Sequence, residues 1–283
     1  MNYRHAFHAG NHGDVLKHVL LTRVLIYMLQ KNAALAVLDA HAGIGHYDLT
    51  GLEAFKTGEW RGGIGRLLAA DLQGDEAAIL LPYLDAVRWM NVDGTLQHYP
   101  GSPALARGLL RAGDRLLLNE LHPQDFQTLS ARFVDDSLVR ISHVDAAQAI
   151  RAALPFMEKR GLVLIDPAFE VTDETSRVAR MVAQALRRMA HVCMMIWYPV
   201  TTQAFADSFC ESLTFAGAKG VLRAEVLVRA PFENGGLAGS GVVVVNPPWT
   251  LHDELNIILP ALASILGEGG QGSYKLEWMI KPT

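Results

Sequence analysis

An acid and a proline close a buried apolar run in the stretch LVLIDPAFE, residues 162–170. Consecutive branched apolar residues of this kind are typical of a central strand in a parallel sheet. Asp166 then lies at the carboxyl end of the strand, the edge at which open α/β sheets bind ligands. The Asp166 carboxylate and the Pro167 carbonyl could accept two hydrogen bonds from one amino group, while Phe169 stacks on the ring that carries it. The alternative is a strand that ends in a proline turn above a buried phenylalanine.

Three other predicted strands also end in an acid, at Asp39, Glu120 and Asp145. Since burying a charge is costly unless it is paired, acids at four strand ends favour a ligand site over chance. An acid after the second strand commonly binds the ribose hydroxyls of an adenosine cofactor, which gives that role to Glu120. We expect Asp145, after the third strand, to accept the adenine amino group.

A glycine-rich turn follows the first strand in LAVLDAHAGIGHY, residues 35–47. Gly43 and Gly45 let the backbone approach a ligand closely. The third glycine of a dinucleotide fingerprint would fall at Asp48, and no helix start for a pyrophosphate follows. The turn fits a zwitterionic ligand better, such as the amino-acid part of S-adenosylmethionine.

The first 18 residues combine four histidines with Arg4, Lys17 and two aromatic residues, one of which is Tyr3. We expect a helix from an N-cap at Asp14 to about residue 30. His8 and His12 have metal-ligand spacing, but the glycines around them disfavour a helix, so no metal site is expected. The segment is predicted to be a mobile arm that contacts the phosphates and bases of RNA. An ordinary polar N-terminus is the alternative.

The α/β alternation stops between residues 48 and 100, where two stretches have helical periodicity. We predict an inserted helical subdomain at 48–100, between residues 1–47 and 101–283 of the main domain. Its tryptophans and arginines (Trp60, Arg61, Arg66, Arg88 and Trp89) could face RNA or could serve packing, and the sequence leaves both open. Beyond the insertion, Ser102 is a candidate N-cap for a helix that has Pro103 in its first turn.

Composition places the chain among globular proteins of the reducing cytosol. The net charge is -4 over 283 residues, so a nucleic-acid partner would have to bind at a local basic patch. The two cysteines, Cys193 and Cys210, form no metal-binding motif and are expected to be buried thiols. The N-terminus is unlike a signal peptide, and no apolar run is long enough to span a membrane.

A second stretch, Asn246 to Trp249, also has the Asn/Asp-Pro-Pro-aromatic pattern that binds an amine. It follows the last predicted strand, which is antiparallel in seven-stranded methyltransferase sheets. Its carboxyl end would therefore lie at the opposite edge from the cofactor. We predict a structural turn there and keep Asp166 as the candidate acid.

The chain resembles bacterial 23S ribosomal RNA adenine-N(6)-methyltransferases of the J type, over nearly its full length. The resemblance rests on the blocks YRHAFHAGNHGDVLKH, LDAHAGIGHY, YPGSP, LNELHP, RGLVLIDPAFE, WYP and SGVVVVNPPW. It implies a Rossmann-like class I S-adenosylmethionine-dependent sheet of seven strands, the last antiparallel, with a small helical insertion. Two motifs depart from the family pattern: Asp-Pro-Ala-Phe stands for Asp-Pro-Pro-Tyr, and Ala146 stands where glycine is usual.

The resemblance also implies roles for individual residues. Asp166 matches the catalytic acid and Tyr3 an N-terminal residue that meets RNA. The cofactor-contacting positions correspond to His18, His41, Ser102, Glu120, Asp145 and Asp166. The expected activity is methylation of a specific adenine in 23S RNA by a cytoplasmic monomer acting on protein-free or early precursor RNA.

Three other functions compete with this prediction. A DNA adenine-N(6)-methyltransferase shares the chemistry, but the short insertion is small for a target-reading domain. A nucleotide-dependent oxidoreductase would need the third glycine and a phosphate-binding helix start. A non-catalytic RNA-binding protein would not need acids at four strand ends.

Overall fold

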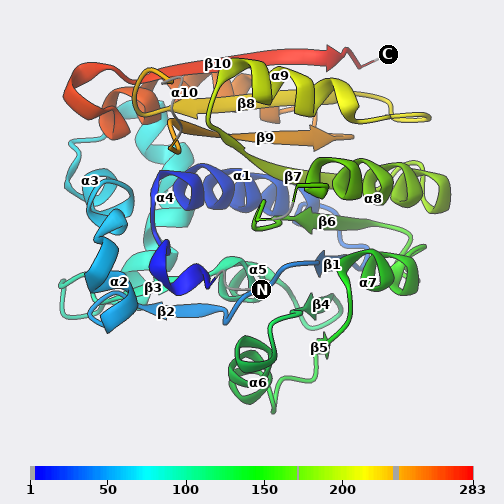
Figure 1. Cartoon of the computed structure of the whole chain (residues 1–283). Helices are drawn as coiled ribbons and strands as arrows, with labels where there is room; N and C mark the ends of the chain where they lie inside the picture. The colour runs from blue at the N-terminus through cyan, green and yellow to red at the C-terminus, as the bar shows by residue number, and fades with distance from the viewer. Residues whose placement is uncertain (1–3, 171, 232–235, 283) are drawn as a thin grey trace.

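The computed structural model describes residues 4–170, 172–231 and 236–282. An eight-stranded sheet runs through the molecule in the order β10-β8-β9-β7-β6-β1-β4-β5, with helices on both faces (Figure 1). Its strands are β1 (Ala36–Asp39), β4 (Arg115–Asn119), β5 (Val139–Ser142), β6 (Gly161–Ile165), β7 (Cys193–Val200), β8 (Val221–Leu227), β9 (Gly239–Val245) and β10 (Ser273–Ile280). A separate pair joins β2 (His46–Asp48) to β3 (His98–Pro100), in a region where no strand was predicted.

The predicted α/β sheet is confirmed. Strands β5, β4, β1, β6 and β7 are parallel, and β9 is antiparallel to both of its neighbours. The sheet has one strand more than the seven predicted, because β10 pairs antiparallel with β8 at the edge. The acids Asp39, Glu120, Asp145 and Asp166 follow parallel strands and therefore share one edge of the sheet.

Helices cover both faces of the sheet. Successive residues of a strand point alternately to the two faces and so belong to two different cores. Leu162 and Leu164 of β6 belong to the core beneath α1, whereas Val163 and Ile165 belong to the core beneath α8. This two-sided burial explains why β6 is a continuous apolar run. The longer helices are α1 (His12–Leu29), α4 (Gly74–Trp89), α5 (Ser102–Leu109), α6 (Pro123–Arg132), α7 (Ala146–Ala153), α8 (Glu174–Arg188), α9 (Gln203–Ser212) and α10 (Leu251–Leu266).

The N-terminal segment packs onto the domain rather than extending from it as an arm. A 3₁₀ turn, η1 (His5–Phe7), precedes α1, whose first turns are largely buried. The predicted N-cap at Asp14 is wrong, because Asn11 caps α1 by accepting a hydrogen bond from the Asp14 N–H. The Asp14 carboxylate is thereby left for other partners. Tyr3 lies outside the described residues.

The segment 48–100 contains α2 (Leu52–Thr57), η2 (Glu59–Arg61), α3 (Ile64–Ala69) and α4. Its apolar residues join the same core as those of α1 and α10. Trp60 packs against that core and Arg66 donates to the carbonyls of Leu266 and Gly267, so both serve packing. Trp89 is exposed.

Asn246 forms a structural turn, as predicted. Because β9 is antiparallel, its carboxyl end lies at the edge opposite the four acids. The Asn246 amide donates to the carbonyls of Ala190 and Val192 and accepts from the Lys219 N–H. Every polar group of this side chain is thus used to hold neighbouring loops.

Two further features bear on the predicted class. Both cysteines are free and buried. Within the described part of the chain, no helix combines the length and apolar character needed to cross a bilayer.

Gly63→Ala is expected to destabilise the fold by about 1–3 kcal/mol, because overpacking forces the backbone to move. A Cβ at position 63 would collide with the backbone of Gly10 and Asn11, where the N-terminal segment meets the segment 48–100. Gly62→Ala is the matched control, since the nearest atom that a Cβ there would meet is the Glu59 carbonyl oxygen, 3.6 Å away. Denaturant unfolding of both variants measures the difference, and equal stabilities would contradict this account of the contact.

Candidate functional site

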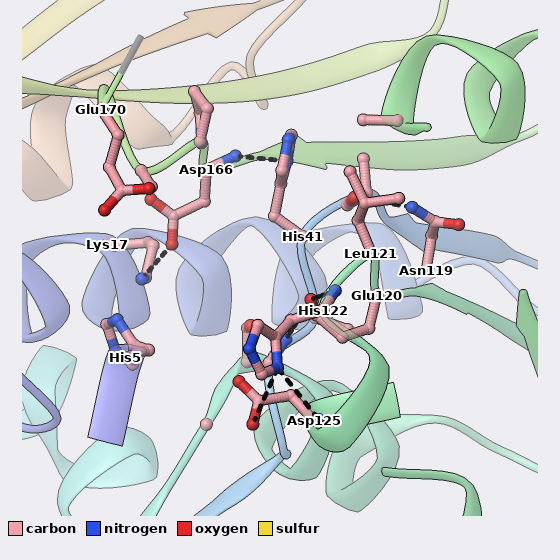
Figure 2. A pocket seen from close by; sticks show the side chains of 18 of the residues that line it. His5, Lys17, His41, Asn119, Glu120, Leu121, His122, Asp125, Asp166 and Glu170 are labelled. Carbon is pink, nitrogen blue, oxygen red and sulfur yellow. Dashed lines mark hydrogen bonds and ion pairs between the residues drawn. The ribbon is translucent and has the colours of Figure 1, made fainter. Parts of the chain in front are cut away.

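A cavity of about 300 Å³ opens at the carboxyl edge of the parallel strands (Figure 2). This volume is at the small end of the range for small-molecule sites. Its wall draws on α1, the ends of β1, β4 and β6, and the first residues of α5, α7 and α8. All the residues predicted to contact a cofactor line it: His18, His41, Gly43, Ser102, Glu120, Asp145, Ala146 and Asp166.

Glu120 ties the glycine turn to β4. Its two carboxylate oxygens accept the N–H groups of Gly43 and His122, each at 2.7 Å. Gly43 has φ +61°, a conformation that favours glycine. Burial raises the pKa of Glu120 above its usual value even though these bonds favour the ionised form. The carboxylate is thus held in place with lone pairs left for hydroxyl donors.

Asp39 positions the cavity wall without lining it. The Ser102 hydroxyl donates to Asp39 Oδ2 at 2.6 Å, and the His41 N–H donates to Oδ1 at 3.1 Å. Ser102 was predicted as an N-cap, which is wrong, because Gly101 occupies the cap and Ser102 is the first residue of α5. Burial raises the pKa of Asp39 to about 6.

His18 is a neutral, buried imidazole in the wall. Its Nδ1 lies 2.8 Å from the Tyr99 hydroxyl, which in turn lies 2.9 Å from the Tyr83 hydroxyl. Burial lowers the pKa of His18 to about 3. Its Nε2 is buried and makes no hydrogen bond within the described residues. A buried ring nitrogen without a hydrogen bond is unusual in a folded protein and is often explained by a ligand.

Asp145 joins two helices at the other end of the cavity. Oδ1 accepts the Ala147 N–H at 2.9 Å and so caps α7, whose first residue is Ala146. Oδ2 accepts from Arg177 Nη2 of α8 at 2.7 Å. Both oxygens of this acid therefore have protein donors.

Lys17 lies between two acids and faces Asp166 in Figure 2. Its ammonium donates to Asp166 Oδ2 and pairs with Asp14 Oδ1 at 2.8 Å. Asp14 Oδ2 also lies 2.8 Å from His5 Nε2. Burial alone would lower the pKa of Lys17, but the two carboxylates hold it well above the usual value. Lys17 is therefore a permanent cation in a nearly water-free position.

The backbone of Asp166 is fixed as well. Its N–H donates to His41 Nδ1 at 3.2 Å. Burial lowers the pKa of His41 to about 4, so the neutral ring can accept this bond. The carboxylate oxygen Oδ1 accepts no hydrogen bond within the described part of the chain.

A second cavity of about 270 Å³ lies on the other side of Asp166. It shares His5, Lys17, Asp166 and Ala168 with the first cavity. Phe169 and Trp197 form an aromatic part of its wall, with ring centroids 6.0 Å apart in an edge-to-face arrangement. Phe169 has φ +52°, uncommon for a residue with a large side chain, and packs between α9 and β7. Pro167 lines only the first cavity.

Several residues of the site were not predicted, among them His5, Lys17, Asp125, Glu174 and Arg177. For Lys17 a signal was present, because Asp14 and Lys17 are opposite charges three apart in a mainly apolar helix. Of the residues predicted to meet RNA, Arg4 lies 3.4 Å from Glu53 and 3.7 Å from Asp125. His8 and His12 were considered as metal ligands and were not expected to bind a metal. In the structure His8 pairs with Glu59, and His12 Nδ1 lies 3.4 Å from the Ser240 hydroxyl.

Comparisons with known proteins identify the family to which the chain is similar. The family model described as "Ribosomal RNA large subunit methyltransferase D, RlmJ" matches residues 32–280. The chain is 40% identical over 281 residues to a Haemophilus influenzae protein named "Ribosomal RNA large subunit methyltransferase J", with 99% of each chain covered. An Escherichia coli K12 protein of the same name is 38% identical over 280 residues, again with 99% of each covered.

A solved structure is similar as well. It is the crystal structure of protein LPL1258 from Legionella pneumophila, which is 33% identical in sequence. The superposition has a TM-score of 0.86 and covers 95% of this chain and 98% of the other. The fold described above is therefore shared over nearly its whole length.

Asp39→Asn is expected to gain stability relative to the wild type as the pH rises from about 4 to about 8. The pKa of Asp39 is about 6 in the folded protein and lower in the unfolded chain. The wild type therefore loses stability as the pH rises through this interval, and the amide does not. The difference in unfolding free energy should change by about 1–3 kcal/mol. Denaturant unfolding at both pH values checks this. Asp135→Asn, at an exposed acid, is the control. A difference that stays constant with pH for Asp39→Asn would contradict the expectation.

Proposed function

Since the chain belongs to the RlmJ family of ribosomal RNA large subunit methyltransferases, we propose that it methylates the exocyclic N(6) amine of a specific adenine in 23S ribosomal RNA. One observation carries the proposal: Asp166 lines both cavities. A methyl donor in one and a base in the other would meet at this carboxylate.

The first cavity suits S-adenosylmethionine, which supplies an electrophilic methyl group when bound. Glu120, with lone pairs still available, would accept the ribose hydroxyls. Asp145 would accept from the adenine amino group, next to Ala146. The glycine turn at Gly43, with His41, Ser102 and the buried Nε2 of His18, would surround the amino-acid end. The uncommitted His18 nitrogen is the feature of this structure that calls for a ligand atom.

The second cavity suits a flat base. Phe169 and Trp197 offer aromatic surface, and a base flipped out of an RNA stack would be held by such surface. An adenine amine is a poor nucleophile because its lone pair is delocalised into the ring. Oδ1 of Asp166, which borders both cavities, would accept one of its N–H groups and so favour a tetrahedral nitrogen, whereas Pro167 lines only the first cavity. Positioning and electrostatics would supply most of the rate gain.

Lys17 would hold the catalytic carboxylate in its orientation, because its ammonium donates to Asp166 Oδ2 and leaves Oδ1 for the substrate amine. Because Asp14 fixes Lys17 from the other side, the orientation of Asp166 depends on α1 as well as on β6.

The N-terminal segment is proposed to bind the RNA substrate. Tyr3 and Arg4 are proposed to contact RNA near the second cavity, whose wall includes the neighbouring His5 and His8. We propose protein-free 23S RNA or an early precursor as the substrate, a monomer as the working form and the bacterial cytoplasm as the location. The named relatives favour ribosomal RNA over DNA, and the oxidoreductase alternative has no support among them.

Asp166→Asn should lower methyl transfer to protein-free 23S RNA at least about 100-fold, because the amide presents a donor where the amine needs an acceptor. Transfer of labelled methyl from S-adenosylmethionine, with identification of N(6)-methyladenosine, is the measurement, and DNA of the same sequence is the substrate control. Asp173→Asn, at an exposed acid on the same loop, should retain activity. Wild-type turnover by Asp166→Asn would rule out the proposed role.

Lys17→Met should slow single-turnover methyl transfer at least about 10-fold while S-adenosylhomocysteine binding changes much less, because the lost contact is to the reacting acid. The variant also leaves Asp14 and Asp166 without their shared cation, so its unfolding free energy should fall. Lys31→Met, at an exposed lysine, is the control. If the single-turnover rate were unchanged and only cofactor affinity fell, Lys17 would belong to cofactor binding instead.

A further inference from the structure

Glu174 is a buried carboxylate that the proposed mechanism does not use. It is the first residue of α8, is 9% exposed and lines the first cavity. Within the described residues its side chain accepts no hydrogen bond. Its closest cation is Arg177, whose Nε lies 4.0 Å from Glu174 Oε1.

The protein holds the Glu174 carboxylate less tightly than the carboxylate of Glu120. Glu120 accepts two hydrogen bonds from the protein, whereas Asp125, another buried acid of the wall, accepts none within the described residues. Partial burial raises the pKa of the Glu174 carboxyl above its usual value, so its charged form carries a desolvation cost. Because Glu174 faces the cavity, a donor on a bound ligand would remove that cost.

Arg177 shows which part of the ligand this donor belongs to. The same guanidinium donates to Asp145 through Nη2 and approaches Glu174 through Nε. A guanidinium is small and planar, so Asp145 and Glu174 must lie close together at the same end of the cavity. One cation placed between two carboxylates also reduces their mutual repulsion.

We propose that Glu174 is a second acceptor for the exocyclic amine of the cofactor's adenine, beside Asp145. This inference rests on the proposed use of S-adenosylmethionine. An exocyclic amine has two N–H bonds, and one acceptor reads only one of them. Two acceptors positioned by Arg177 would require both N–H bonds. The site would therefore reject a 6-oxo group, which has neither, and an N-methylated amine, which has one.

The test compares ligands on the full chain by calorimetric titration. The ligands are S-adenosylhomocysteine, S-inosylhomocysteine with a 6-oxo group, the N(6)-methyl form, and methylthioadenosine, which lacks the amino acid. The wild type should prefer S-adenosylhomocysteine to both altered forms. In Glu174→Gln the amide can donate to a 6-oxo group, so the preference over S-inosylhomocysteine should fall about 10- to 100-fold, the value of one charge-assisted hydrogen bond.

Asp173→Asn is the matched control, because it removes a charge from the same helix start at an exposed position. It should leave every preference unchanged. Methylthioadenosine should lose affinity in Glu174→Gln as S-adenosylhomocysteine does. Denaturant unfolding of each variant establishes that it is folded.

Three outcomes would overturn the inference. One is an equal weakening of all ligands in Glu174→Gln with preferences intact, which indicates a structural role. Another is a loss for S-adenosylhomocysteine but none for methylthioadenosine, which moves Glu174 to the amino-acid end. If the wild type binds neither S-adenosylhomocysteine nor methylthioadenosine, the proposed function itself is wrong. That result differs from one in which both ligands bind but Glu174→Gln leaves the ligand preferences unchanged.

Discussion

A buried lysine between two aspartates holds the first helix of the chain to the end of its central strand. Asp14, Lys17 and Asp166 are each largely shielded from water, and removal of Lys17 would leave two carboxylates without their shared cation. Asp14 also accepts the Gly10 N–H and pairs with His5, so the N-terminal segment follows the same constraint. On the other side, the Asp166 N–H reaches His41 and thereby the glycine turn. The position of the candidate acid is thus set from two directions.

The fold and the cavity wall were largely predictable because their signals are local. Continuous apolar runs such as residues 162–165 indicate strands buried on both faces, and the acid after each run marks the strand end. Once the strands are parallel, their ends must meet at one edge, which brings Glu120, Asp145 and Asp166 together. The same reasoning correctly separated Asn246 from the site, because β9 runs in the opposite direction.

Contacts between distant segments could not be predicted in this way. Lys17 and Asp166 are 149 positions apart, and Ser102 and Asp39 are 63 apart. Aspartate and asparagine are about equally good N-caps, so local preference could not choose between Asp14 and Asn11. The choice follows from Lys17 and His5, which engage the Asp14 carboxylate. Strand β10 was missed because it is a partly exposed edge strand with mixed polar and apolar residues.

The two cavities share side chains, and this has a consequence for energetics rather than for shape. A ligand in either space would touch Lys17, Asp166 and His5, which also face the other space. If a ligand in one space shifts these side chains, the binding free energy of the ligand in the other space gains a coupling term. By thermodynamic linkage that term is reciprocal: whatever factor the first ligand imposes on the second, the second imposes on the first. Occupancy of the two cavities is then one coupled equilibrium.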